Sequence, residues 1–281
     1  KNLSMFDFGN SFTASRPVWD LVADALPNTI LLSVVTLSVS FPAGILMGIW
    51  QAVRQGKPDD TLISVGSLTL YSMPSFWFGM MLQLFVAFYF STWLMDQIDA
   101  GALPAWLSIL NFDVAGMYSN ELVMEMAIDE DSVTWSRWLG DVLHHTLLPG
   151  VAMGFASAAS TARYMRSSLL EVIRQDYIRT ARAKGLGVLP VLGHALRNAA
   201  IPIATTVGVG IALLIGGVVV TETVFAIPGV GRLVIDSVQR HDYPVIQSVL
   251  LLSAGVYVLR ERLTQQLDTG AMFRQPNGRL A

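Results

Sequence analysis

The chain contains no cysteine and little charge. Without cysteine, its 281 residues can form no disulfide bond, iron–sulfur cluster or thiolate zinc site. Only 14% of the residues are charged, whereas 53% are hydrophobic, and the mean hydropathy is positive. This composition is too apolar for an ordinary soluble domain. It therefore predicts a membrane protein.

Two further absences concern binding sites. The phosphate-binding pattern GxxxxGK[ST] does not occur, so no nucleotide site of that type is expected on this chain. Histidine is scarce, and only two of its positions are adjacent, so a metal site is not expected. The histidines are His144, His145, His194 and His241.

Long stretches without Asp, Glu, Lys or Arg are what the chain does contain, and a membrane-spanning helix needs about 20 largely apolar residues. The second stretch is long enough for one helix plus an approach along the membrane surface, and the fifth must extend into its flanks. We predict an all-α, polytopic membrane helix bundle with five helices in this chain. The stretches are Leu26–Val53, Thr61–Met95, Val142–Ala162, Asn198–Thr221 and Tyr243–Leu259.

The loops differ in charge, and positive charge concentrates on the cytoplasmic side of a membrane. The loop between the third and fourth stretches carries seven basic residues against Glu171 and Asp176, so it is predicted to be cytoplasmic. The segment between the second and third stretches carries nine acidic residues against Arg137 alone, so it is predicted to be external.

Five spans place the two ends on opposite sides, with Lys1 outside. We therefore expect a first helix to be missing and six helices in the intact protein; a five-span protein with an external N terminus is the alternative. The expected organisation is an external segment 1–25, a transmembrane domain 26–267 and a cytoplasmic tail 268–281. Within the domain we expect an external acidic loop 91–141 and a cytoplasmic loop 168–200.

The cytoplasmic loop has helical periodicity. Leu170, Ile173, Tyr177 and Ala181 fall on one apolar side of a helix predicted over Ser168–Lys184. Glycine is the residue best suited to the left-handed end of a helix, so Gly185 is expected to end it. Pro190 suits the first turn of a second short helix.

Basic and small residues meet near the expected glycine turn. Thr180, Ala181 and Ala183 are small enough for another protein to approach closely, and Arg179, Arg182 and Lys184 can pair with its carboxylates or carbonyl oxygens. The same pattern also suits a basic amphipathic segment on anionic lipid headgroups. Composition alone leaves both interpretations open.

Two stretches of this loop carry a family resemblance. "DYIRTARAKGL" (Asp176–Leu186) and "HALRNAAIP" (His194–Pro202) resemble the EAA loop of permease subunits from binding-protein-dependent ABC importers, in the dipeptide, oligopeptide and nickel branch. Four other stretches resemble the family in the same order: "SMPSFWFG", "HTLLPG", "ETVFAIPGVGRL" and "RHDYPVIQ". The end "YVLRERLTQQLDTG" and the long acidic external segment depart from the family pattern.

The resemblance implies a type I ABC importer permease fold in a bacterial or archaeal cytoplasmic membrane. It also implies partners: a second, paralogous permease subunit or a second copy of this chain, two ATPase subunits, an external solute-binding protein and membrane lipid, but no nucleic acid. ATP and magnesium would bind the ATPase subunits, so the chain itself is expected to be a transport subunit without cofactor, metal or enzymatic activity.

The resemblance further implies functional residues. The ATPase-coupling residues would be Asp176, Tyr177, Arg179, Thr180, Ala181, Arg182, Ala183, Lys184 and Gly185. The pathway or gate would include Pro74, Trp77, Glu222 and Pro228.

Two of these pathway positions have a physical reason of their own. Glu222 is a lone acid at the outer end of an apolar run, and we expect it to pair with or order the external turn "ETVFAIPGVG". Pro74 inside the second stretch frees a backbone carbonyl and is expected to kink the helix toward the pathway. A tolerated proline beside an aromatic residue of the membrane interface is the alternative at that position.

Peptides are the cargo that the resemblance implies, with nickel or glutathione as alternatives within the family. A self-contained, ATP-independent transporter would show two similar halves, and no internal repeat is visible. A membrane enzyme would place paired acids or a Ser-Lys or His-Glu set within the spans. Apart from Glu222 and the His144–His145 doublet, the predicted spans contain no such candidates.

Overall fold

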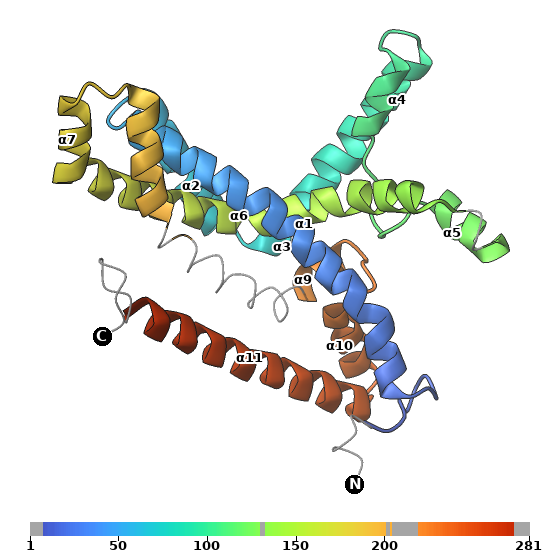
Figure 1. The fold of residues 1–281 in the computed structure, drawn as a ribbon. Helices are drawn as coiled ribbons and strands as arrows, with labels where there is room; N and C mark the ends of the chain where they lie inside the picture. The colour runs from blue at the N-terminus through green and yellow to red at the C-terminus, as the bar shows by residue number, and fades with distance from the viewer. Residues whose placement is uncertain (1–7, 130–132, 201–202, 204–218, 273–281) are drawn as a thin grey trace.

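The computed structural model describes residues 8–129, 133–200, 203 and 219–272 (Figure 1). In these residues the regular structure is helical, apart from one isolated β-bridge between Asn10 and Pro17. The all-α prediction is confirmed. By length and hydropathy, Val18–Val53 and Ser75–Asp99 could each cross a membrane, and Tyr243–Val258 is a shorter apolar stretch.

Two long helices lie along each other and form the centre of the fold (Figure 1). They are α1, Val18–Val53, and α6, Trp135–Ile173. A Cβ atom on Gly44 would lie 2.6 Å from the carbonyl oxygen of Ala158, and one on Gly48 would lie 2.6 Å from that of Ala162. Glycine is therefore needed at both positions, because the α1 backbone approaches α6 too closely for any side chain.

The second predicted span is divided. Met73 and Pro74 both have extended backbone, which fits the restriction that a proline places on the residue before it. The predicted kink within one helix is therefore wrong, because Pro74 separates two helices and stands at the start of the second. The elements are α2, Pro58–Ser72; α3, Ser75–Leu82; the π-helix η2, Gln83–Phe90; and α4, Ser91–Asp99.

An ion pair joins α2 to α6 beside the turn that connects α1 to α2. The Arg166 guanidinium donates to both carboxylate oxygens of Asp60, at 3.0 and 2.9 Å, and the Gly56 amide also donates to Asp60. The Arg166 hydrogen bonds hold the pKa of Asp60 below its ordinary value despite the burial of that carboxyl. The inner ends of α2 and α6 are thus fixed together.

The acidic segment that was predicted to be external contains two short helices. They are the 3-10 helix η3, Ala105–Leu110, and α5, Asn120–Ile128, whose N-terminus is capped by the Ser119 hydroxyl accepting from the Leu122 amide. In Figure 1, α4 and α5 project away from the centre of the molecule. The helix α6 begins at Trp135, within the segment expected to be loop.

The last described part contains α9, Val219–Val224; α10, Val230–Gln239; and α11, Tyr243–Met272. Most of the fourth predicted span, Asn198–Thr221, lies outside the described residues. The helix α11 contains the whole fifth span and continues beyond its expected end at Leu259.

The N-terminal segment folds onto the residue before α11. Asp242, 1% exposed, accepts hydrogen bonds from the Ser11 hydroxyl, from the Thr13 hydroxyl at 2.7 Å and from the backbone amides of Phe12 and Thr13. Burial raises the pKa of Asp242, but these hydrogen bonds outweigh it and lower the pKa to about 2. A charged carboxylate thus holds the start of the described chain against the residue that precedes α11.

Candidate functional site

The predicted cytoplasmic helix is two helices at a sharp bend. α6 ends at Ile173, Arg174 and Gln175 form the connection, and α7, Asp176–Ala183, starts in a new direction (Figure 1). Gln175 has extended backbone, with φ −73° and ψ 154°. The continuous helix predicted over Ser168–Lys184 is therefore wrong, because its periodicity does not reveal a bend of two residues.

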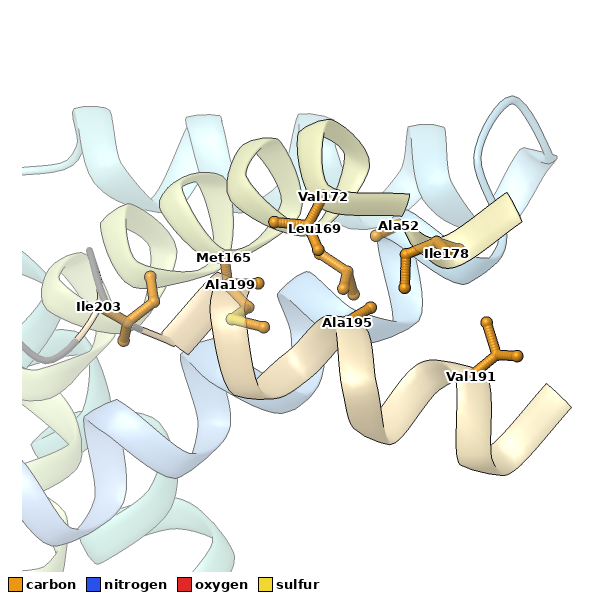
Figure 2. Packing of buried hydrophobic residues seen from close by; sticks show 9 residues of the cluster. All are labelled: Ala52, Met165, Leu169, Val172, Ile178, Val191, Ala195, Ala199 and Ile203. Carbon is orange, nitrogen blue, oxygen red and sulfur yellow. The ribbon is translucent and has the colours of Figure 1, made fainter. Parts of the chain in front are cut away.

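The bend changes which side chain of α7 is buried. Ile178 is fully buried, whereas Tyr177, expected on the apolar side, is 38% exposed. Figure 2 shows Ile178 within a cluster contributed by α1, α6 and the helix 188–200. The other members of this inner cluster are Ala52, Met165, Leu169, Val172, Val191, Ala195, Ala199 and Ile203. Burying such a side chain contributes about 1.5–3 kcal/mol, which anchors α7 to the long helices.

The opposite face of α7 is free for contact within the described residues. Arg179, Thr180, Arg182, Ala183 and Lys184 are exposed, and Ala181 is half-buried at the edge of the inner cluster. Asp176 also lies on the surface, 3.4 Å from Arg179, but pairs this exposed contribute little to stability.

The connection after α7 adds apolar surface to this basic face. Leu186 is 41% exposed, Val188 80% and Leu189 79%. Basic side chains beside exposed apolar ones are typical of a surface that binds another protein.

The turn at the end of α7 is well defined. Gly185 has φ +80°, a conformation that favours glycine, and the next helix runs from 188 to 200, with Pro190 in its first turn. The Asn198 side-chain amide donates to the Tyr177 hydroxyl at 2.6 Å, which ties this helix to α7. The predicted helix end and the position of Pro190 are confirmed.

A second site lies around Glu222 in α9. This carboxylate is fully buried, and its Oε2 accepts from the Arg232 amide at 2.9 Å, in the first turn of α10. The carboxylate acts as the N-terminal cap of α10, where the helix dipole favours negative charge. Glu222 thus orders the turn between α9 and α10, and its effect on transport stays a prediction.

Two residues of α1 that were not predicted complete this arrangement. The Thr29 hydroxyl donates to Glu222 Oε1 at 2.6 Å and accepts from the Val230 amide at 2.9 Å, while the Asn28 amide donates to the Pro228 carbonyl at 2.8 Å. In the sequence, the only sign of this role is that Asn28 and Thr29 are two adjacent polar residues at the start of an apolar run. Gly229 leaves room for the carboxylate, because a Cβ there would lie 2.2 Å from Glu222 Cδ.

The four predicted pathway residues fall into two places. Glu222 and Pro228 share the outer turn, whereas Pro74 and Trp77 lie at the start of α3, beside a surface hollow that they line with Leu68, Thr69, Ser72 and Met73. The helix α3 reaches the turn through Gly79, where an added Cβ would lie 3.2 Å from the Phe225 ring. The two places are thus linked by packing and not by direct contact.

The turn is also tied to the external segment. The Gly116 amide donates to the Phe225 carbonyl at 2.8 Å. The Gln83 side chain donates to the carbonyls of Val114, at 2.7 Å, and Val224, at 2.9 Å. In the described residues no group of three or more His, Cys, Asp or Glu is placed to hold a metal ion.

The geometry describes a helical protein with an exposed basic face on α7 and an ordered turn around Glu222, and a family comparison gives its class. Residues 40–263 match the family described as "Binding-protein-dependent transport system inner membrane component". This match includes α7 and the turn 222–229, but not Asn28 and Thr29, and it shows that the chain belongs to that family.

The chain is similar to named permeases over most of its length. It is 37% identical over 259 residues to the Di/tripeptide transport system permease protein DppB of Pseudomonas aeruginosa, covering 92% of this chain and 73% of that protein. It is 37% identical over 264 residues to the Dipeptide transport system permease protein DppB of Escherichia coli K12, covering 93% and 74%. It is 36% identical over 264 residues to the Dipeptide transport system permease protein DppB of Alkalihalophilus pseudofirmus, covering 92% of this chain and 74% of that protein.

Proposed function

We propose that this chain is the permease subunit of an ATP-driven ABC importer that carries dipeptides or oligopeptides across the cytoplasmic membrane. The names of its relatives support the peptide cargo, since similarity extends over nine-tenths of the chain. Family membership supports dependence on an external solute-binding protein.

One observation supports the site at which ATP hydrolysis is coupled to transport. The helix α7 has a buried face anchored by Ile178 and an exposed face with Arg179, Arg182 and Lys184, followed by exposed apolar residues. A rigid helix that presents basic and apolar groups suits docking into a groove of another protein. A lipid-bound segment would instead turn its apolar face toward the membrane, whereas Ile178 is covered by protein.

The remaining partners follow from this role. A second permease subunit, paralogous or identical, would complete the pathway, and two ATPase subunits would bind ATP and magnesium. This chain would then hold no nucleotide of its own, consistent with the missing phosphate-binding loop.

Co-purification of the full-length protein with its ATPase subunits tests the proposal. Arg182→Glu reverses a charge on the exposed face of α7, whereas the matched control Arg197→Glu makes the same change on an exposed position of the helix 188–200. We expect Arg182→Glu to lower the recovery of ATPase at least about tenfold, the effect of about 1.4 kcal/mol. The control should retain it.

The same pair of variants separates the docking interpretation from the lipid interpretation. Attraction to anionic lipid depends on the number of basic residues near the membrane, so both variants would lose vesicle binding alike. Equal ATPase recovery from the two variants would contradict the assignment of α7. For the cargo, ATP-dependent uptake of a labelled dipeptide into vesicles is expected, and uptake without ATP would contradict the proposed mechanism.

A further inference from the structure

The buried histidine of α6 lies between two carboxylates. The side chain of His145 is 3% exposed. Its Nδ1 lies 2.8 Å from the backbone oxygen of Asp141, and its Nε2 lies 2.6 Å from Oδ2 of Asp113, in the external segment. The Asp141 carboxylate is also near, at 3.7 Å from Nδ1.

These contacts determine how many protons the pair holds. A backbone carbonyl can only accept, so Nδ1 must carry a hydrogen. Nε2 faces a carboxylate oxygen, which also only accepts while it is ionised, and in the described residues this nitrogen has no hydrogen bond of regular geometry. The arrangement therefore needs one additional proton, either on His145 as an imidazolium or on Asp113.

The external segment that Asp113 belongs to covers the outer turn. The Gly116 amide binds the Phe225 carbonyl of that turn, and the Ser119 amide donates to the Asp141 carboxylate at 2.9 Å. The Tyr118 hydroxyl lies 3.4 Å from Oδ1 of Asn28, the residue whose amide binds the turn at Pro228. Residues 112–119 are thus held between α6 on one side and the Glu222 turn on the other.

We propose that His145 is a positioning residue that binds a proton to hold the external segment 112–119 over the turn 222–229, and that loss of this proton releases the segment. A proton that is bound in the held arrangement and lost in the released one favours the held arrangement as pH falls and the released one as pH rises. Histidine is the side chain suited to this change between about pH 5 and pH 8.

The other charged groups near His145 do not supply an alternative partner. On α6, His144 stacks on Phe112 and bonds the Ile109 carbonyl at 3.0 Å, while Arg137 pairs with Glu125 of α5 at 2.7 Å. The α1 carboxyls, Asp20 and Asp24, precede the part of α1 that packs here; α3 and η2 contain no ionisable residue before Tyr89. On α9, Glu222 is bound by Thr29 and the Arg232 amide.

Tyr118 is the remaining ionisable group on the external segment. Burial, and next the charge of Asp141, raise the pKa of Tyr118, so its hydroxyl stays neutral over the pH range of interest. The proton that changes the segment therefore belongs to the His145–Asp113 pair.

A spin label on the segment tests the proposal. The chain has no cysteine, so Ala115→Cys gives it a single labelling site at an exposed position; the label is attached to this subunit before the transporter is assembled in lipid nanodiscs. We expect the mobile fraction of the label to rise several-fold between about pH 5 and pH 8, the range in which histidine titrates.

Three variants assign the change to the pair. Asp113→Asn places an amide donor opposite the unprotonated Nε2, so the segment should stay held at every pH. His145→Gln removes the imidazole and should abolish the pH response. The matched control is His144→Gln, which should keep the response, because its Nε2 faces a carbonyl and needs no additional proton.

Each result decides for or against the proposal. A wild-type label whose mobility does not change with pH overturns it, and so does an unchanged response in Asp113→Asn or His145→Gln. Asp113 is half-exposed, so the Asp113→Asn test does not depend on a change in the core. The inference rests on the proposed function only for its consequence in transport. A label that responds to pH while peptide uptake fails would contradict the proposed function alone, and uptake with a label that does not respond would contradict this inference alone.

Discussion

The inner and outer ends of the molecule are ordered by different forces. At the inner end, α7 is held by an apolar side chain, Ile178, and presents its charges to the outside. At the outer end, a charged side chain, Glu222, is buried and accepts hydrogen bonds from Thr29 and from the Arg232 amide. The surface charges of the inner site contribute little to its folding, whereas the outer site depends on every donor around one carboxylate.

This difference affects how each site fails. Removing apolar contacts weakens packing in proportion to the volume lost, so an inner variant should loosen α7 gradually. Removing a partner from a buried charge leaves that charge uncompensated, which costs more than the contact itself contributes. Four substitutions test this contrast, from the largest expected effect to the smallest.

Gly229→Ala should have the largest effect. Its Cβ would lie 2.2 Å from Glu222 Cδ and displace the buried carboxylate, so we expect a loss of at least about 3 kcal/mol in the free energy of unfolding. Thermal unfolding in detergent measures it. Gly140→Ala, in the first part of α6 with open space at its Cβ, is the matched control and should be neutral. Equal stability of the two variants would mean that the turn yields easily.

Ile178→Ala should be the largest effect at the inner end. It removes a fully buried side chain, which costs about 2 to 5 kcal/mol, and we expect α7 to detach locally. Hydrogen exchange of residues 176–183 measures the detachment. Ile178→Val keeps most of the contact and should cost about 0.5 to 1.5 kcal/mol. If exchange at α9 and α10 increased as much as at α7, the destabilisation would be global and not local to α7.

Thr29→Val keeps the size of the side chain and removes its hydroxyl. Glu222 and the Val230 amide each lose a partner, so we expect a loss of about 1.5 to 3 kcal/mol and faster hydrogen exchange at the start of α10. Thr223→Val is the control, since that exposed hydroxyl bonds only a carbonyl of its own helix. An effect of the control equal to that of Thr29→Val would argue against a special role for the carboxylate.

Asp242 extends the comparison to a second outer carboxylate. Because its pKa is lowered to about 2, the stabilisation is present above the ordinary value of 3.8 and is lost as the pH falls toward 2. This lowering of the pKa corresponds to about 2 kcal/mol in the free energy of unfolding. We expect limited proteolysis of residues 8–17 to accelerate over this pH range. In Asp242→Asn that acceleration should disappear, because no carboxyl remains to titrate; its persistence would point to another group.

The sequence was sufficient for the class of fold and for the position of the inner loop. Its charge-free stretches predicted the long helices, and Gly185 and Pro190 marked the turn after α7 correctly. Periodicity misplaced the buried face, however, because a bend at Arg174 and Gln175 rotates the following residues so that Ile178 replaces Tyr177. Which face is buried depends on the direction of α7 relative to α6, and that direction is not encoded in spacing.

The outer site was only partly predictable. Glu222 was conspicuous as a single acid in an apolar run, but its side-chain partner Thr29 lies 193 residues away on α1. Without knowledge of that contact, Asn28 and Thr29 are only a polar pair inside α1, at the start of an apolar run. Pro74 was misread for a similar reason, since a proline can bend a helix or separate two, and the packing of α3 on α9 favours the second here.

The close contact of α1 with α6 has a mechanical consequence. Each helix contains proline that removes a backbone hydrogen bond: Pro27 and Pro42 in α1, and Pro149 in α6. Pro42 lies between two tight contacts with unbroken α6, and Pro149 is next to a tight contact with unbroken α1. The prolines of the two helices are not opposite each other, so each lies beside an intact stretch of the other helix. Neither helix can therefore bend at its proline unless the other bends too.

The pair of helices α1 and α6 connects the two sites. Ala52 near one end of α1 contacts the group around Ile178, and Thr29 near the other end binds Glu222, about 35 Å away at 1.5 Å per residue. We therefore expect a displacement imposed on α7 to move the outer turn through this helix pair.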